Sequence, residues 1–255
     1  MKVIGIIPAR MGSSRYPGKP LAEILGMPMI EHVYRRSLMS ETLDDLYVAT
    51  PDQEIIDAVE KFGGKAIITS PSHNRCTDRI AEAAEDIECD IVVDIQGDEP
   101  LLYPEIIDMV IEPFKNDSDL VSVNPIAKII DEDNIEDRND VKVVTDKNSN
   151  ILYYSREPIP SRYLKKDADL YKLVCIFPFR KDFLMKFTEL EQTPLEIIES
   201  IDNLRIIEHG YRVKAVVIPR PIDGVDTPED KKYVEKIMKS DSIYQKYKGQ
   251  LGVKV

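Results

Sequence analysis

The 255-residue sequence contains few cysteines, no long apolar run and no excess of positive charge. Its three cysteines cannot all pair with one another and form no C-x-x-C motif, so we expect a reduced, cytoplasmic protein. No stretch approaches the roughly 20 apolar residues of a membrane span, and the first residues lack a signal-peptide pattern. The net charge of −12 argues against nucleic acid and an anionic membrane as partners. Small anionic ligands are not excluded, because they respond to the local field of a cleft.

The first half of the sequence alternates between apolar, β-branched runs and helical periods. The runs are Val3–Ile7, Leu46–Ala49, Ala66–Thr69, Ile91–Ile95 and Leu120–Val123, and the helical periods are Met29–Leu38, Gln53–Phe62, Thr77–Asp86 and Pro104–Phe114. Strands that alternate with helices of this length predict an α/β fold with a mostly parallel sheet and helices on both faces.

The alternation loosens after about residue 124. The later elements are a predicted hairpin of Val141–Thr145 and Ile151–Tyr154, a strand at Leu173–Phe177, a helix from Pro194 towards Leu204, a strand at Val213–Ile218 and a helix from Pro228. We therefore expect one domain over residues 1–255, with a nucleotide-binding half at about 1–124 and a smaller mixed lobe at about 125–210. The last strand and helix are expected to return to the core.

A basic loop follows the first predicted strand. It contains Arg10, Arg15 and Lys19 among glycine, serine and proline residues. Small residues let the backbone wrap closely around a polyanion, arginine supplies planar paired donors, and lysine supplies a point charge. The loop is neither a Walker motif nor a G-x-G-x-x-G motif, but its composition suits a triphosphate. The alternative is a surface loop with scattered charges.

Two acidic segments complement this loop. Asp98 follows the predicted strand Ile91–Ile95, and ligands of open parallel sheets bind outside the carboxyl ends of the strands. Asp226 precedes the last predicted helix, which Thr227 and Pro228 are expected to begin. Carboxylates that face a triphosphate predict a bound Mg²⁺, since this ion favours one or two carboxylates together with phosphate oxygens.

Several segments, in order over nearly the whole chain, resemble the CMP-Kdo synthetases, which are 3-deoxy-manno-octulosonate (Kdo) cytidylyltransferases. The matching segments are Ile7–Arg10, Pro17–Leu21, Gln96–Pro100, Val141–Val144, Tyr154–Arg156, Pro158–Pro160, Pro194–Glu196, Leu204–Arg205 and Gly224–Asp230. The resemblance implies a Rossmann-like nucleotidyltransferase fold, usually dimeric, that transfers CMP from CTP to a sugar-acid hydroxyl with Mg²⁺ and releases pyrophosphate.

The same resemblance implies roles for individual residues. Arg10, Lys19 and Asp98 would be catalytic, and Asp98 and Asp226 would hold the metal. The nucleotide would contact Pro8, Ala9, Arg10, Ser13, Ser14, Arg15, Lys19, Thr77, Arg79 and Gln96. The acceptor would contact Arg75, Gln96, Arg156, Leu173, Phe177, Glu196, Glu199 and Asn203. CTP, a small acidic acceptor and a second copy of the chain are the expected partners.

The sequence departs from the family pattern where the acceptor is expected. Leu173, Phe177 and Phe179 stand where the family has histidine and two tyrosines, and each change removes a hydrogen-bond donor. Arg75 and Cys76 replace a Ser-Gly pair, so Arg75 either binds an anion or is a solvated loop charge. CTP as substrate is therefore a firmer expectation than Kdo as acceptor.

Three alternatives stay open at this point. The acceptor could be a modified sugar acid or a small phosphorylated acid, which would give a CDP-type product. The protein could be a nucleotide-binding protein without activity. A third alternative is an isoprenoid-type cytidylyltransferase, which the two acidic segments resemble less.

Three further residues or segments have structural interpretations. His32 falls inside the first predicted helix and is expected to be structural. Cys175 lies in an apolar run and is expected to be a buried small hydrophobe. The acidic residues 131–137 are expected to form a solvated loop or helix start.

Overall fold

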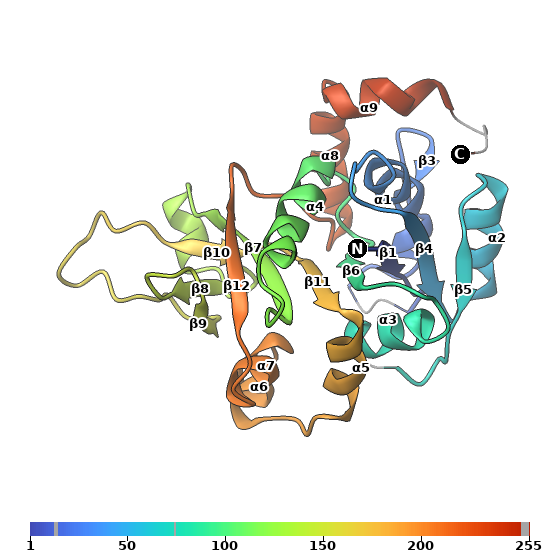
Figure 1. Ribbon diagram of the computed structural model, residues 1–255. Coiled ribbons are helices and arrows are strands. Elements are labelled where there is room, and N and C mark those ends of the chain that lie inside the picture. The colour runs from blue at the N-terminus through green and yellow to red at the C-terminus, as the bar shows by residue number, and fades with distance from the viewer. Residues whose placement is uncertain (13–14, 74, 251–254) are drawn as a thin grey trace. The chain divides into compact units, whose positions relative to one another are not determined.

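The structure is a computed structural model that describes residues 1–12, 15–73, 75–250 and 255. It divides into two compact units (Figure 1). Unit 1 contains residues 1–108 and 222–255, and unit 2 contains residues 109–221. Within the described residues, no helix has the length and apolar content to cross a membrane.

The sheet of unit 1 is parallel, in the order β5–β4–β1–β6. Its strands are β1 (Val3–Pro8), β4 (Asp45–Thr50), β5 (Ala66–Ile68) and β6 (Ile91–Ile95). Strands β1 and β6 are buried along their whole length, as expected for parallel strands covered on both faces. The helices between the strands are α1 (Met29–Ser37), α2 (Gln53–Lys61) and α3 (Cys76–Ala84). The predicted α/β alternation is confirmed.

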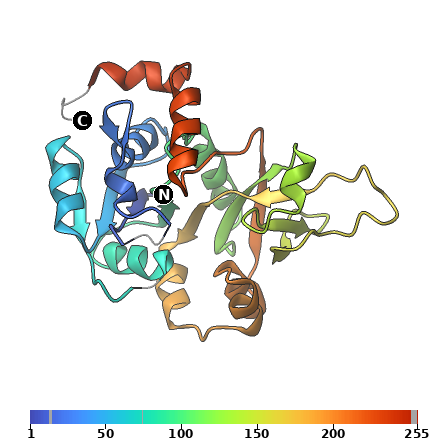
Figure 2. The same cartoon turned by 180° about the vertical axis from the view of Figure 1, so that it is seen from behind.

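The C-terminal helices of unit 1 pack beside its first helix. These are α8 (Pro228–Met238) and α9 (Ser242–Tyr247), red in Figure 2, followed by a 3₁₀ turn η4 (Lys248–Gln250). Val234 and Met238 share a buried cluster with Ile24 and Met29. The short hairpin β2 (Glu23–Ile24) and β3 (Met27–Pro28), which leads into α1, therefore packs against α8 through Ile24.

Strand β7 (Ser122–Lys128) is central to unit 2. It pairs antiparallel with β10 (Tyr171–Leu173) and β11 (Ile176–Arg180), and parallel with β12 (Val213–Ile218). The predicted hairpin forms as β8 (Lys142–Thr145) and β9 (Ile151–Ser155), and β8 also pairs with β10. The remaining elements are α4 (Pro104–Ile111), which spans the boundary between the units, η2 (Glu112–Lys115), η3 (Glu132–Ile135), α5 (Lys181–Glu189), α6 (Pro194–Glu199) and α7 (Asn203–Glu208).

The structure changes three details of the sequence prediction. The strand expected at Leu173–Phe177 is two strands, because Ile176 N–H donates to the carbonyl of Val174 at 2.9 Å and turns the chain. Cys175, in this turn, is exposed, so its prediction as a buried hydrophobe is wrong. The helix expected from Pro194 breaks at Ser200, whose φ of 54° is left-handed. Strand β12 lies in unit 2 and α8 in unit 1, and the expected organisation as one domain stays a prediction.

Candidate functional site

A cavity of about 250 Å³ lies at the carboxyl ends of β1 and β6 in unit 1. It gathers most of the residues that the sequence predicted for the nucleotide and the metal. Its lining residues are Pro8, Ala9, Arg10, Arg15, Lys19, Pro20, Met29, His73, Arg75, Cys76, Arg79, Gln96, Gly97, Asp98 and Asp226. Thr77 is buried in the first turn of α3 and does not line the cavity, and Ser13 and Ser14 lie outside the described residues.

Backbone contacts hold the basic loop in place. The N–H of Met11 donates to Asp52 Oδ2 at 2.7 Å, and the N–H of Gly18 donates to the carbonyl of Met11 at 3.0 Å. Gly18 has φ 72° and precedes the 3₁₀ turn η1 (Lys19–Leu21), so the left-handed backbone that glycine permits sets the start of this turn. Lys19, the first residue of the turn, is thereby placed beside the carboxylates.

The two carboxylates come from loops that approach each other closely. The loop of Asp98 also packs closely on the end of β1: a Cβ at Gly97 would lie 2.9 Å from the carbonyl oxygen of Pro8, so glycine is required there. The N–H of Val225 donates to the carbonyl of Asp98 at 2.8 Å. The predicted start of α8 is confirmed: Thr227 and Asp230 form a capping box, and Asp230 Oδ2 also accepts from the N–H of Asp226 at 3.0 Å. Asp98 and Asp226 are therefore fixed by their backbones.

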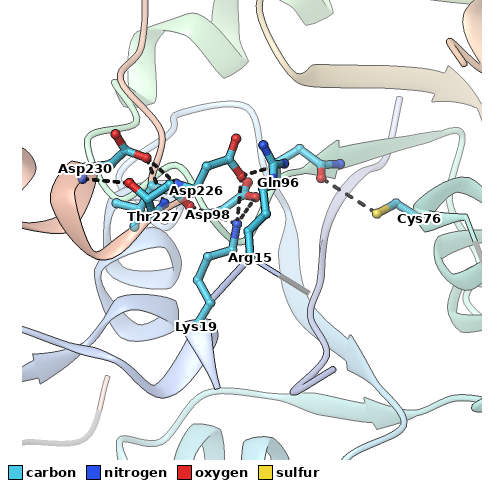
Figure 3. Close-up of polar contacts among 9 residues, drawn as sticks. Arg15, Lys19, Cys76, Gln96, Asp98, Asp226, Thr227 and Asp230 are labelled. Carbon is cyan, nitrogen blue, oxygen red and sulfur yellow. Dashed lines mark hydrogen bonds and ion pairs between the residues drawn. The ribbon is translucent and has the colours of Figure 1, made fainter. Parts of the chain in front are cut away.

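Lys19 lies between these carboxylates (Figure 3). Its Nζ donates to Asp98 Oδ2 at 2.7 Å, to the carbonyl of Val225 at 2.8 Å and to Asp226 Oδ1 at 3.3 Å. Arg15 Nη2 also contacts Asp226 Oδ1, at 3.0 Å. The Lys19 side chain is 11% exposed and that of Arg15 is 58% exposed, so the lysine is the enclosed cation of the pair.

The opposite side of the cavity contains Gln96 and the start of α3. Gln96 Nε2 donates to Asp94 Oδ1 at 2.8 Å, and its Oε1 accepts from Cys76 Sγ at 3.8 Å (Figure 3). Arg79 is buried and donates to Thr69 Oγ1 at 2.6 Å, and burial lowers the pKa of its guanidinium. Cys76 and His73 line the cavity although the sequence assigned them no role. The signal available in the sequence was their place beside Arg75, where the chain departs from the family pattern.

The oxygens around Lys19 Nζ fit a divalent metal in their chemistry. Two carboxylates and one backbone carbonyl converge on a single cation, and oxygen is the ligand type that Mg²⁺ prefers. Within the described residues, no group of three or more His, Cys, Asp or Glu side chains is placed to hold a metal. A metal at Asp98 and Asp226 would therefore need additional oxygens, which a polyphosphate or water supplies.

Of the residues predicted to contact the acceptor, Arg75 and Gln96 line the cavity of unit 1, and the others lie in unit 2, where the structure shows mainly internal contacts. Arg156 donates through Nε to the carbonyl of Glu199 at 2.6 Å, through Nη1 to that of Arg138 at 2.9 Å, and through Nη2 to that of Ser200 at 3.3 Å. The Glu199 carboxylate accepts from the N–H of Arg156 at 2.9 Å. An acceptor role for Arg156 requires the guanidinium to release at least one of these bonds.

Glu196 and Asn203 are buried, unlike Arg156, and both make hydrogen bonds to other buried side chains. Glu196 is fully buried, and its carboxylate receives paired bonds of 2.8 and 2.5 Å from Arg205. Asn203 is buried and donates to Asn124 Oδ1 at 3.0 Å; this oxygen also accepts from Tyr154. These contacts give both residues a structural role, and contact with an acceptor stays a prediction.

The three substituted positions differ in exposure. Phe179 is 1% exposed and stacks against Phe187 at a centroid distance of 6.3 Å, so its change from tyrosine lies in the core. Leu173 and Phe177 are half-buried. Of these three changes, the ones at Leu173 and Phe177 are the candidates for altering the acceptor site.

A basic loop and paired carboxylates at the carboxyl ends of parallel strands define a site for a polyphosphate. Nucleotidyl and phosphoryl transfer depend on this combination of positioning and charge stabilisation. The class of protein that the fold and the cavity indicate is therefore a nucleotidyltransferase.

Comparison with known proteins specifies this class further. A family model described as Cytidylyltransferase matches residues 4–216. The 3-deoxy-manno-octulosonate cytidylyltransferase of Geobacter metallireducens is 41% identical over 93% of this chain and 98% of its own length. That of Syntrophus aciditrophicus is 45% identical over 93% of this chain and 97% of its own length. A solved structure of CMP:2-keto-3-deoxy-manno-octonic acid synthetase complexed with CTP is 36% identical, has a TM-score of 0.90, and matches over 94% of this chain and 99% of that chain.

The chain therefore belongs to the cytidylyltransferase family and, within it, to the 3-deoxy-manno-octulosonate cytidylyltransferases. It is an enzyme of the nucleotidyltransferase class, and the Rossmann-like fold implied by the resemblance is confirmed.

Proposed function

We propose that the protein transfers CMP from CTP to a hydroxyl of Kdo or a closely related sugar acid, in a reaction that depends on Mg²⁺. The acceptor oxygen forms a bond to the α-phosphorus, the bond from this phosphorus to the bridging oxygen breaks, and pyrophosphate leaves. The hydroxyl proton passes to water. The observation that carries the proposal is the convergence of Arg10, Arg15, Lys19, Asp98 and Asp226 on one cavity.

The residues of the chain act mainly by position and charge. Arg10, Arg15 and Lys19 bind the triphosphate and stabilise the charge that develops on the leaving pyrophosphate. Asp98 and Asp226 hold the metal. When bound, Mg²⁺ supplies Lewis-acid charge stabilisation and lowers the pKa of an attacking hydroxyl. This division of roles needs no covalent intermediate on the protein.

The side-chain amide of Gln96 is oriented by a hydrogen bond to Asp94, and this orientation decides which of its atoms a ligand in the cavity can meet. Its amide nitrogen donates to Asp94, so its carbonyl oxygen is left facing the cavity beside Cys76. We propose that this oxygen accepts a hydrogen bond from the nucleotide or the acceptor. Arg75, which also lines the cavity, adds a cation that suits an acidic acceptor.

Leu173 and Phe177 bear on which acceptor the enzyme uses. Both are half-buried and take the place of hydrogen-bonding residues in the family pattern. Loss of one bond to a buried hydroxyl costs about 1–3 kcal/mol. A modified sugar acid, such as an amino-Kdo, is therefore the second candidate acceptor.

The test is pyrophosphate release from CTP, Mg²⁺ and a panel of acceptors that includes Kdo, amino-Kdo, neuraminic-type acids and small phosphorylated acids. UTP serves as the control for the base, and EDTA as the control for the metal. Release with Kdo that EDTA abolishes supports the proposal. Release with another acceptor alone reassigns the substrate, and CTP binding without turnover on the whole panel refutes the proposed reaction.

A pair of variants tests the metal assignment. Asp98→Asn is expected to lower kcat by about 100-fold or more, because it removes a charge that acts on the transition state. Asp57→Asn is the control: Asp57 is an exposed carboxylate on α2 that accepts a bond from Gln53 and does not line the cavity. Equal activity of both variants would contradict the role of Asp98.

We also propose that the protein forms a homodimer through unit 2. The support is a set of exposed large hydrophobic side chains in this unit: Ile130, Leu152, Tyr163, Leu164, Ile197, Ile198 and Val217. Sedimentation equilibrium of the full chain measures the mass directly, and a monomer at micromolar concentration would contradict this proposal.

A further inference from the structure

The contacts of Lys19 satisfy its ammonium group completely. The group has three N–H donors, and the structure gives it three oxygen acceptors: Asp98 Oδ2, Asp226 Oδ1 and the carbonyl of Val225. The side chain is 11% exposed, so water contributes little to this arrangement. Lys19 is therefore bound as a cation within the chain's own oxygen cage.

These oxygens are the ones that would bind the metal. Mg²⁺ binds oxygen at about 2.0–2.1 Å, whereas the ammonium lies 2.7 to 3.3 Å from the three oxygens. An ion bonded to both carboxylates would occupy the space of the ammonium. The two cations therefore exclude each other from the cage.

We infer that Lys19 and the divalent cation compete for this cage, and that a polyphosphate promotes metal binding by drawing the ammonium away. The inference rests on the proposed metal role of Asp98 and Asp226. Lysine presents a compact charge on a flexible stem, which lets the ammonium move from carboxylate to phosphate oxygens without moving the backbone. The metal and the nucleotide are then coupled through one side chain.

The balance of charge supports this exchange. The carboxylates of Asp98 and Asp226 face two cations, Lys19 and Arg15, so these four side chains together carry no net charge. A dication that joined them would leave an excess of positive charge, which the phosphates of a nucleotide offset. The cage therefore favours the metal together with a polyphosphate over the metal alone.

The experiment measures binding of Mn²⁺, a paramagnetic probe, to the full chain without nucleotide, by the loss of the free-ion EPR signal. Lys19→Met keeps the length of the side chain and removes its charge. It is expected to bind Mn²⁺ at least about tenfold more tightly than the wild type. Adding Asp98→Asn to Lys19→Met is expected to reverse this gain, because it removes a metal ligand.

Arg15→Met is the matched control. It removes a nearby cation that contacts Asp226 and is largely exposed, so its gain should be well below that of Lys19→Met. An equal gain in both variants, or no gain in Lys19→Met, overturns the inference. Circular dichroism checks folding, and Lys19→Gln gives the same comparison if the methionine variant is misfolded.

Failure of the proposed reaction gives a different result. If Lys19→Met binds Mn²⁺ more tightly but no acceptor yields pyrophosphate with the wild type, the competition is supported and the reaction is refuted. If the wild type turns over and Lys19→Met shows no gain, the reaction is supported and the competition is refuted.

Discussion

His32 is expected to make the enzyme less stable in mild acid. Its imidazole is completely buried in α1, with Nε2 2.7 Å from the carbonyl of Ile24 and Nδ1 2.8 Å from Tyr247 Oη. A carbonyl only accepts, so Nε2 carries the proton and Nδ1 accepts from the tyrosine hydroxyl. Protonation of Nδ1 would break the bond from Tyr247, which joins α9 to α1.

The size of the effect follows from the pKa of His32. The pKa of His32 is lowered from 6.5 to about 4, chiefly by burial; the bond to Ile24 opposes this change, and the charges of Arg36 and Arg35 contribute to it. Below pH 6.5 the unfolded chain binds a proton that the folded chain does not, so stability falls as the pH falls from 6.5 to 4. The difference corresponds to about 3 kcal/mol of unfolding free energy.

Urea unfolding of the wild type and of His32→Gln at pH 7.5 and 4.5 measures this contribution. Glutamine can donate and accept but does not titrate in this range, so the loss of stability between the two pH values should be about 2–3 kcal/mol smaller in His32→Gln. Val33→Ala, in the same helix, is the control, because it removes buried apolar volume without a titrating group. An identical loss in the wild type and His32→Gln would refute the reasoning.

Two further predictions concern packing around the site and in unit 2. Arg205→Met leaves the fully buried Glu196 carboxylate without its arginine partner and should lower the unfolding free energy by about 3–5 kcal/mol. Adding Glu196→Leu to Arg205→Met should restore much of this free energy, because the buried charge is removed. Urea unfolding measures both variants, and equal stability of the single and double variants would contradict this prediction. Gly97→Ala places a Cβ 2.9 Å from the carbonyl oxygen of Pro8 and should lower kcat by about tenfold or more, because the loop of Asp98 must shift. Gly249→Ala, whose Cβ would meet no atom of the described residues within 4 Å, should keep wild-type kcat in the same steady-state assay.

The core of unit 1 could be predicted because its signals are local. The β-branched runs of β1 and β6 are buried on both faces, and the start of α8 has the expected Thr227 cap and Pro228. The breaks in unit 2 depend on single backbone conformations, such as the left-handed Ser200, which no local pattern indicates. Helix α5 was missed although Phe183, Leu184 and Phe187 form a buried face at helical spacing.

The candidate site could be predicted in its residue types but not in its pairing. Motif resemblance brought Lys19, Asp98 and Asp226 to one site, and the structure places them in one cavity. The sequence assigned Lys19 to the phosphates and the carboxylates to the metal, without showing that they bind one another. The contact of Lys19 with the carboxylates depends on the close approach of Gly97 to the carbonyl of Pro8 and on the bond from Lys19 to the carbonyl of Val225.

The charge of the whole chain and the charge of its cavity have opposite signs, and this contrast explains how an acidic protein suits an anionic substrate. Five cationic side chains line the cavity: Arg10, Arg15, Lys19, Arg75 and Arg79. Among the described residues that line the cavity, Asp98 and Asp226 carry the opposing charge, although the chain carries a net charge of −12. A substrate inside a cleft responds to the nearby charges, because salt screens those beyond about 10 Å. The internal pairing of Lys19 removes part of this local charge, and in the proposed exchange phosphates would restore it by replacing the carboxylates as partners of Lys19.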